Sequence, residues 1–366
     1  MEETTRRRIS RIKKALAARD LDALLITCPE NRYYLSGFWA EDLGFTESSG
    51  ALLITRHENL LLTDGRYEEQ ARSQAPSFAI HIYKKGLPRL LSSLFRQIGI
   101  TRCGYEPSFL SCSRFEHLKK AVYPVRFVDF GNLVFRMRAI KDNKELEKTR
   151  EAQEVAEEVF EGLLSWIRPG MTEKEVAFEI LKGLSMKADG PSFAPIVASG
   201  PNSALPHAIP QDRPIEKGEP VIIDMGARLD GYCSDMTRTI FLGEPNEYFK
   251  RIYMVVKEAQ NAAQTFVRAG VTAKEADAAA RNVIKDHGYG QYFCHGLGHG
   301  VGIAIHEAPA LSFRNRKKLR SNMVVTIEPG IYVPGKGGVR LENMGIVREK
   351  GLTLLTSNKW YYDFRI

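Results

Sequence analysis

Hydrophobic residues in the first third of the chain follow two spacings, one typical of helices and one typical of strands. Ile9, Ile12 and Leu16 recur every three to four positions, which predicts an amphipathic first helix. Three short apolar runs and a second helical pattern follow, at residues 21–26, 50–55, 59–64 and 87–98. Apolar runs of this length between polar segments indicate buried strands. The pattern therefore predicts an α/β domain with its own core, covering residues 1–135.

From residue 136 onward the pattern changes to pairs of long amphipathic helices separated by blocks of strands. One helix pair is expected at 143–167 and 172–184, where Thr172 and Glu175 have the spacing of a capping box. A second pair is expected at 248–269 and 273–287. No sequence repeat is obvious, although the order of elements occurs twice. Residues 136–366 are therefore interpreted as a second domain.

Acidic residues lie at or beside the ends of the strand patterns in this second domain. Asp224 ends one apolar run, and Asp235 follows it after an Asp-Gly dipeptide at 230–231, a strong hairpin-turn signal. Two neighbouring antiparallel strands could then each present one aspartate. Two later strand patterns carry further acids, Glu328 and Glu342. These four carboxylates are candidates for one shared site.

Three of the eight histidines lie in one glycine-rich segment, as His295, His299 and His306. Each glycine is about 1 kcal/mol worse than alanine in a helix, so a helical pair of zinc-binding histidines is excluded. We expect a tight turn at His299, followed by a short apolar strand at 301–305 that carries His306 at its far end. One imidazole with four carboxylates suits Mn²⁺ or Co²⁺ at least as well as Zn²⁺, and four acids indicate two ions rather than one.

The local sequences around these residues resemble the pita-bread-fold metallopeptidases, a family that includes Xaa-Pro aminopeptidases, Xaa-Pro dipeptidases (prolidases) and methionine aminopeptidases. The matching motifs are Ile-Asp-Met-Gly, Ser-Asp-Met-Thr-Arg, Gly-His-Gly-Val-Gly, Ile-Glu-Pro-Gly and Arg-Leu-Glu-Asn. Residues 31–38 and 62–67 are similar to the creatinase/prolidase amino-terminal domain. The resemblance implies a two-domain α/β protein, with that module at 1–135 and a pseudo-symmetric, antiparallel pita-bread catalytic domain at 136–366. It also implies the proline-directed branch of the family and a homodimer.

The resemblance implies a role for each candidate residue. Asp235 and Glu342 would bridge two divalent ions, Asp224 would hold one of them, and His299 with Glu328 would hold the other. Glu328 would be the general base, and His306 would donate a hydrogen bond to the scissile carbonyl or the developing oxyanion. Substrate contacts are assigned to His207, which also has a catalytic assignment, and to His295, His306 and Arg340. For Arg340, a salt bridge to an acidic ligand and a contact with the substrate carboxylate are both open.

The implied activity is hydrolysis of the bond before a proline in the second position of a peptide. That bond lacks an N–H and kinks the chain, so it needs a dedicated pocket. The segment after His306 has no cation through Ala310 that could pair with the carboxylate of a dipeptide, which favours an Xaa-Pro aminopeptidase. The alternatives are an Xaa-Pro dipeptidase and a non-enzymatic peptide-binding relative, which the intact ligand set disfavours. Mn²⁺ is the expected metal, with Co²⁺ and Zn²⁺ as alternatives.

Charge and cysteine content limit the expected partners and the location. The net charge is +8, but the basic residues are dispersed, and the runs at 6–8 and 314–320 contain no interleaved aromatics for base stacking, so no nucleic-acid partner is expected.

Five cysteines without a C-x-x-C pair indicate a reducing compartment. No apolar run reaches the length of a membrane span and no signal core follows the start, so a cytoplasmic protein is predicted. Cys294 is expected to be a small buried residue rather than a nucleophile.

Overall fold

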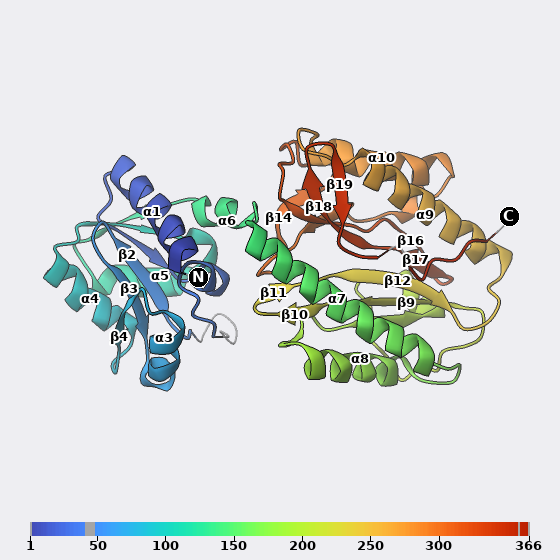
Figure 1. Cartoon of the computed structure of the whole chain (residues 1–366), viewed down its shortest axis with the longest axis horizontal. Helices are drawn as coiled ribbons and strands as arrows, with labels where there is room; N and C mark the ends of the chain where they lie inside the picture. Colours follow the sequence, from blue (N-terminus) through green and yellow to red (C-terminus); the bar gives the residue numbers. More distant parts are fainter. Residues whose placement is uncertain (1, 41–47, 358, 365–366) are drawn as a thin grey trace. The chain divides into compact units, whose positions relative to one another are not determined.

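The computed structural model describes residues 2–40, 48–357 and 359–364, and it divides the chain into two compact units, Met1–Arg136 and Met137–Ile366 (Figure 1). No helix among the described residues is long and apolar enough to cross a membrane. Each unit has its own hydrophobic core.

The first unit is built on one mixed six-stranded sheet with the order β4-β3-β2-β1-β5-β6. Its strands are β1 (Ala23–Ile26), β2 (Ala51–Thr55), β3 (Asn59–Thr63), β4 (Ala79–Ile82), β5 (Arg102–Tyr105) and β6 (Arg126–Asp129). Its helices are α1 (Glu2–Ala18), α2 (Pro29–Ser36), α3 (Glu68–Gln74), α4 (Leu87–Ile98) and α5 (Cys112–Ala121), with α6 (Leu133–Arg138) at the boundary and short 3₁₀ turns η1 (Gly65–Tyr67) and η2 (Pro107–Phe109). The predicted first helix is confirmed, since α1 buries Ile9, Ile12 and Leu16.

The second unit consists of two helix pairs and the strands between them, shown from green to red in Figure 1. The pairs are α7 (Asn143–Trp166) with α8 (Glu173–Lys187) and α9 (Glu247–Phe266) with α10 (Ala273–Asp286). The first strand block contains β7 (Gly190–Pro191), β8 (Ile196–Ser199), β9 (Pro220–Met225), β10 (Ala227–Leu229), β11 (Tyr232–Cys233) and β12 (Met236–Phe241). The second contains β13 (Gly298–Gly300), β14 (Glu307–Leu311), β15 (Val324–Ile327), β16 (Gly330–Val333), β17 (Gly337–Arg340), β18 (Asn343–Arg348) and β19 (Gly351–Leu354). The 3₁₀ turns η3 (Gly200–Ala204) and η4 (Gly290–Tyr292) complete the unit.

The two helix pairs begin their second helices in the same way, 100 residues apart. Residues 167–175 read Ile-Arg-Pro-Gly-Met-Thr-Glu-Lys-Glu and residues 267–275 read Val-Arg-Ala-Gly-Val-Thr-Ala-Lys-Glu, with the same residue at five of nine positions. In both copies the glycine is left-handed, with φ of 91° and 92°, and the threonine forms a capping box with the glutamate. The structure therefore reveals a short internal repeat where none was expected from the sequence.

The glycine-rich histidine segment differs from its prediction. The expected strand at 301–305 is wrong: His299 lies inside β13, and residues 301–306 form the connection to β14. The backbone of this connection does not continue a ladder, because Gly302 N donates to Ala304 O and the Gly302 carbonyl accepts from Cys233 N at 2.7 Å. Val301 N still donates to Val324 O in β15 at 3.2 Å, and the hydrogen bonds that follow are made within the connection and to β11.

Cys294 is exposed, so the expectation that it is buried is also wrong. The preceding residue, Phe293, points into the core and is 3% exposed. In an extended segment the next side chain points the opposite way, toward solvent.

Candidate metal centre

The first strand block supplies two aspartates to the site. β9 and β12 pair antiparallel with Asp224 opposite Thr237, and Asp235 lies immediately before β12. The chain reverses between β10 and β11 at Asp230 and Gly231, both with positive φ, as the Asp-Gly dipeptide predicts. Asp224 and Asp235 are both buried. The two strands therefore present one carboxylate each to the same region.

The second strand block supplies the imidazole and two glutamates. His299 is in β13, Glu328 follows β15, and Glu342 precedes β18. β13 pairs with β15, and β15 pairs with β18, which brings the three side chains to neighbouring strands of one sheet. The two blocks are joined at this point, because Glu342 N donates to Thr237 O at 3.0 Å and Thr237 Oγ1 donates to Glu342 Oε2 at 2.6 Å.

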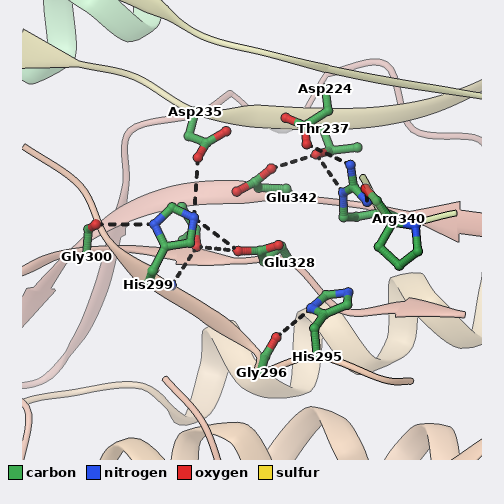
Figure 2. Close-up of polar contacts among 12 residues, drawn as sticks. Asp224, Asp235, Thr237, His295, Gly296, His299, Gly300, Glu328, Arg340 and Glu342 are labelled. Atoms are coloured by element: carbon green, nitrogen blue, oxygen red, sulfur yellow. Dashed lines mark hydrogen bonds and ion pairs between the residues drawn. The ribbon is translucent and has the colours of Figure 1, made fainter. Parts of the chain in front are cut away.

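The side chains of Asp235, Glu328 and Glu342 point toward the His299 ring, and Asp224 lies beside Arg340, as Figure 2 shows. His299 Nε2 lies 3.5 Å from Asp235 Oδ2 and 3.3 Å from Glu328 Oε1. Ligand atoms of Asp235, His299 and Glu342 all lie within 4.8 Å of one another. The other ring nitrogen, His299 Nδ1, is 3.2 Å from the Gly300 carbonyl and donates to it. That bond selects the tautomer whose Nε2 lone pair is available to a metal.

The electrostatics of the cluster match a site for cations. Burial, together with the neighbouring carboxylates, raises the pKa of Asp235 and of Glu342 well above their usual range. Burial raises the pKa of Glu328 to about 7, although Arg340 opposes the rise. Asp224 Oδ1 is buried and no described residue hydrogen-bonds to it. A buried carboxylate oxygen without a donor, beside three acids whose charges repel, fits divalent metal ions.

We predict that the stability of the metal-free protein falls as pH rises from 5.5 to 8. Because the pKa of Glu328 rises from 4.5 to about 7, the folded protein holds protons that the unfolded chain has released. Stability gained from those protons is present below the unfolded value and is lost as pH passes the folded one. The melting temperature of chelator-treated protein should fall by about 5 °C over this pH range, and saturating Mn²⁺ should remove this pH dependence. A melting temperature that is constant or rises over this range would contradict the prediction.

Arg340 forms a salt bridge to one of the ligands. Its Nη2 lies 2.6 Å from Asp224 Oδ2, its Nε donates to Thr237 Oγ1, and its Nη1 donates to Tyr332 Oη and to the Pro206 carbonyl. The Arg340 side chain is only 4% exposed. Of the two roles left open by the sequence, the salt bridge is the one that these contacts support.

A hydrogen-bonded chain continues from Arg340 to His295. The Tyr332 hydroxyl, which accepts from Arg340, lies 2.9 Å from His295 Nε2, while His295 Nδ1 donates to the Gly296 carbonyl. His295 Nε2 is therefore the acceptor of the Tyr332 proton. Burial, aided by the Arg340 charge, lowers the pKa of His295 to about 4, which keeps this ring neutral.

The hydroxyl groups that hydrogen-bond to the ligand candidates were not predicted from the sequence. Thr237 donates to Glu342, and Thr326 Oγ1 donates to Glu328 Oε1 at 3.0 Å. A signal for both was available, because Thr237 lies two residues after Asp235 and Thr326 lies two residues before Glu328. Residues two apart in a strand point to the same face. Tyr332 had no comparable local signal.

All nine candidate residues line one cavity of about 530 Å³ in the second unit. The five ligand candidates, Arg340, and the side chains of His207, His295 and His306 share it with apolar residues that include Phe193, Ile196, Ile209 and Ile305. The rings of His299 and His306 are in edge contact, with centroids 4.3 Å apart. The structure thus brings together every residue that the sequence assigned to the site.

An acidic, histidine-bearing centre between two related helix–strand halves, preceded by a separate α/β unit, defines a metal-dependent hydrolase of two domains. Comparison with known families gives the same result: residues 147–349 match metallopeptidase family M24, and residues 8–140 match the creatinase/prolidase N-terminal domain. The chain belongs to metallopeptidase family M24. The resemblance noted from the motifs and the two-domain α/β pita-bread fold are both confirmed, and the family implies divalent metal ions and peptide substrates.

Several relatives that are named for an activity are similar to this chain over almost its entire length. An Xaa-Pro dipeptidase of Pyrococcus horikoshii is 38% identical over 354 residues, 96% of this chain and 97% of that protein. Among solved structures, an Xaa-Pro dipeptidase from Bacillus anthracis has a TM-score of 0.91 and 39% identity, covering 98% of this chain and 99% of that one. An X-Pro aminopeptidase from Thermotoga maritima has a TM-score of 0.85 and 37% identity, covering 94% and 97%.

Proposed function

We propose that this protein is a dinuclear metallopeptidase that hydrolyses the bond before proline, with Xaa-Pro dipeptides as its first substrate class. The hydrolytic activity is supported by the convergence of five metal-ligand candidates in one cavity whose wall also contains three further histidines. The candidates are Asp224, Asp235, His299, Glu328 and Glu342. The preference for dipeptides rests on the relatives named Xaa-Pro dipeptidase, which favour the dipeptidase alternative over the aminopeptidase expected from the sequence.

The five ligand candidates would hold the two ions, and their donor set suits Mn²⁺ best, with Co²⁺ and Zn²⁺ as alternatives. Bound ions would polarise the scissile carbonyl and lower the pKa of an attacking water molecule. Glu328, whose pKa burial raises to about 7, is the proposed proton acceptor. Asp235 of the first strand block and Glu342 of the second lie close together where the blocks meet, and they are the proposed bridging ligands.

His306 is the proposed donor to the scissile carbonyl. Burial, and then the neighbouring His299, lowers the pKa of His306, so its ring is neutral at pH 7 and retains one N–H to donate. Its ring lines the cavity beside His299, where a donor can stabilise negative charge as it develops on the carbonyl oxygen. His207 and His295 line the same cavity and are proposed to contact the peptide.

An Xaa-Pro aminopeptidase is the second candidate, and one observation favours it. Apart from imidazoles, Arg340 is the one cation among the cavity-lining residues, and its guanidinium is already paired with Asp224. A dipeptide would therefore place its free carboxylate where the described residues offer only imidazole nitrogens as partners. A longer peptide would not bring a carboxylate to this position.

A cleavage panel distinguishes these candidates. We expect Mn²⁺-loaded protein to cleave an Xaa-Pro dipeptide with a kcat/KM about tenfold higher than the matching Xaa-Pro-Xaa tripeptide, and to leave Xaa-Ala intact. The metal concentration must be the same throughout, because a free dipeptide can also remove ions. A preference for tripeptides would establish the aminopeptidase instead. Full metal content without cleavage of any peptide would favour a binding protein.

A further inference from the structure

A buried cluster of three charged side chains lies directly beside His306 in sequence. Glu307, the first residue of β14, has a side chain that is 6% exposed. Its Oε2 lies 2.5 Å from Arg138 Nη2, and its Oε1 lies 2.5 Å from Lys141 Nζ. The side chains of Arg138 and Lys141 are 3% and 1% exposed. Both cations come from the segment that leads into α7, more than 160 residues earlier in the chain.

Stability of the fold does not account for this cluster. Removing three charged groups from water costs desolvation free energy, and apolar side chains of similar volume fill such a space at least as well. The cluster also pairs two cations with a single carboxylate. Although burial raises the pKa of Glu307, Lys141 and then Arg138 outweigh this effect and hold it below its usual range, so the carboxylate is charged.

The surrounding backbone is shaped around the Glu307 carboxylate. A Cβ atom at Gly302 would lie 2.2 Å from Glu307 Oε1 and 3.1 Å from Lys141 Cε, so any larger residue there would displace the carboxylate. Gly300 pairs with Glu307 across the hairpin, and a Cβ at Gly300 would lie 2.4 Å from the Ala308 carbonyl. The chain on both sides of the 301–306 connection is therefore packed closely against Glu307.

The His306 ring has few contacts that would fix its position. Within the described part of the chain its ring has no hydrogen-bond partner, and its one ring contact is with His299. Its side chain is therefore placed mainly by its own backbone, which continues directly into Glu307. Moving the Glu307 carboxylate would move the backbone from which the imidazole projects.

We propose that Glu307, held by Arg138 and Lys141, is a positioning residue that places the His306 imidazole for hydrogen bonding to the scissile carbonyl. This inference rests on the proposed peptidase function. It predicts an effect on kcat rather than on metal binding or KM, because His306 acts on charge that develops during the reaction.

The test uses two variants that disturb the cluster in different ways, together with a matched control. Lys141→Met removes one cation at similar volume, and Gly302→Ala leaves all charges in place but crowds the Glu307 carboxylate. Lys250→Met is the control. It also removes a lysine that pairs with glutamates, Glu244 and Glu247, but Lys250 lies in α9, outside the cavity. We expect both test variants to lower kcat roughly 10- to 100-fold, with KM within about twofold and metal content unchanged. The control should match the wild type.

A second readout does not require turnover. In the metal-free protein, the ¹H–¹³C signal of the His306 ring, assigned with His306→Ala, should shift and broaden in both test variants and stay in place in Lys250→Met. Wild-type kcat in folded Gly302→Ala, with an unmoved His306 signal, would overturn the proposal, and so would a loss confined to metal content. If Lys141→Met does not fold, Gly302→Ala decides the matter. Absence of cleavage by the wild type, with the His306 signal still moving, would instead refute the proposed peptidase function.

Discussion

Asp235→Ala is expected to lose at least one metal ion and to lower kcat/KM by about 10³-fold or more. Asp235 is buried, and its carboxylate lies close to both His299 and Glu342 of the second strand block, so as the proposed bridging ligand it would serve two ions. Stabilisation of the carbonyl oxygen by a metal contributes several kcal/mol to the transition state, and each 1.4 kcal/mol is a factor of ten in rate. Elemental analysis and turnover of an Xaa-Pro peptide measure the two effects.

The stability of this variant separates a ligand from a structural residue. Because Asp224, Glu328 and Glu342 all oppose the ionisation of Asp235, its removal relieves repulsion when no metal is bound. The metal-free variant should therefore melt no lower than the metal-free wild type at pH 8, while Mn²⁺ should raise its melting temperature less. Asp212→Ala, which removes an acid that is 81% exposed, is the control and should behave as the wild type. Undiminished metal content with full activity would refute the ligand assignment.

His306→Ala is expected to keep both ions and to lower kcat by about 10²–10³-fold, the usual cost of deleting one oxyanion donor. The substitution removes a ring that lines the cavity and contacts the His299 ring, while it leaves the carboxylates in place. Steady-state kinetics with a metal assay on the same sample test it.

The control for this second variant is His287→Ala, since His287 caps α10 and its side chain is 46% exposed. It should change neither kcat nor metal content. If His306→Ala instead loses metal in proportion to its loss of activity, His306 is a ligand and the donor role is wrong.

The parts of the fold that were predictable from sequence are those encoded by local spacing. The helical pattern at 87–98 coincides with α4, and the capping residues Thr172 and Glu175 define the start of α8. Aspartates at strand ends were recognisable because apolar runs and an Asp-Gly turn define strands without reference to distant residues. The family motifs then connected these segments into one site.

The parts that were not predictable depend on distant partners. The 301–306 connection is not a strand, because its carbonyls accept hydrogen bonds from Cys233, about 70 residues earlier. The choice between two roles for Arg340 needed the position of Asp224, on a strand 116 residues away. The anchor of Glu307 lies more than 160 residues upstream, and no local pattern indicates it.

The repeated helix start at Thr172 and Thr272 has a consequence for how such a protein can evolve. Each copy consists of one helix pair and the strand block that follows it. The first copy contributes Asp224 and Asp235, and the second contributes His299, Glu328 and Glu342, so neither copy alone carries the full donor set. The left-handed glycines and capping boxes stabilise the start of the second helix in each copy, far from these ligands in sequence. Substitutions at the ligand positions, where the two copies meet, can therefore alter the chemistry while the helix pair and strands of each copy are retained. In a protein with two such copies, the residues that maintain the fold and the residues that determine the activity can therefore change independently.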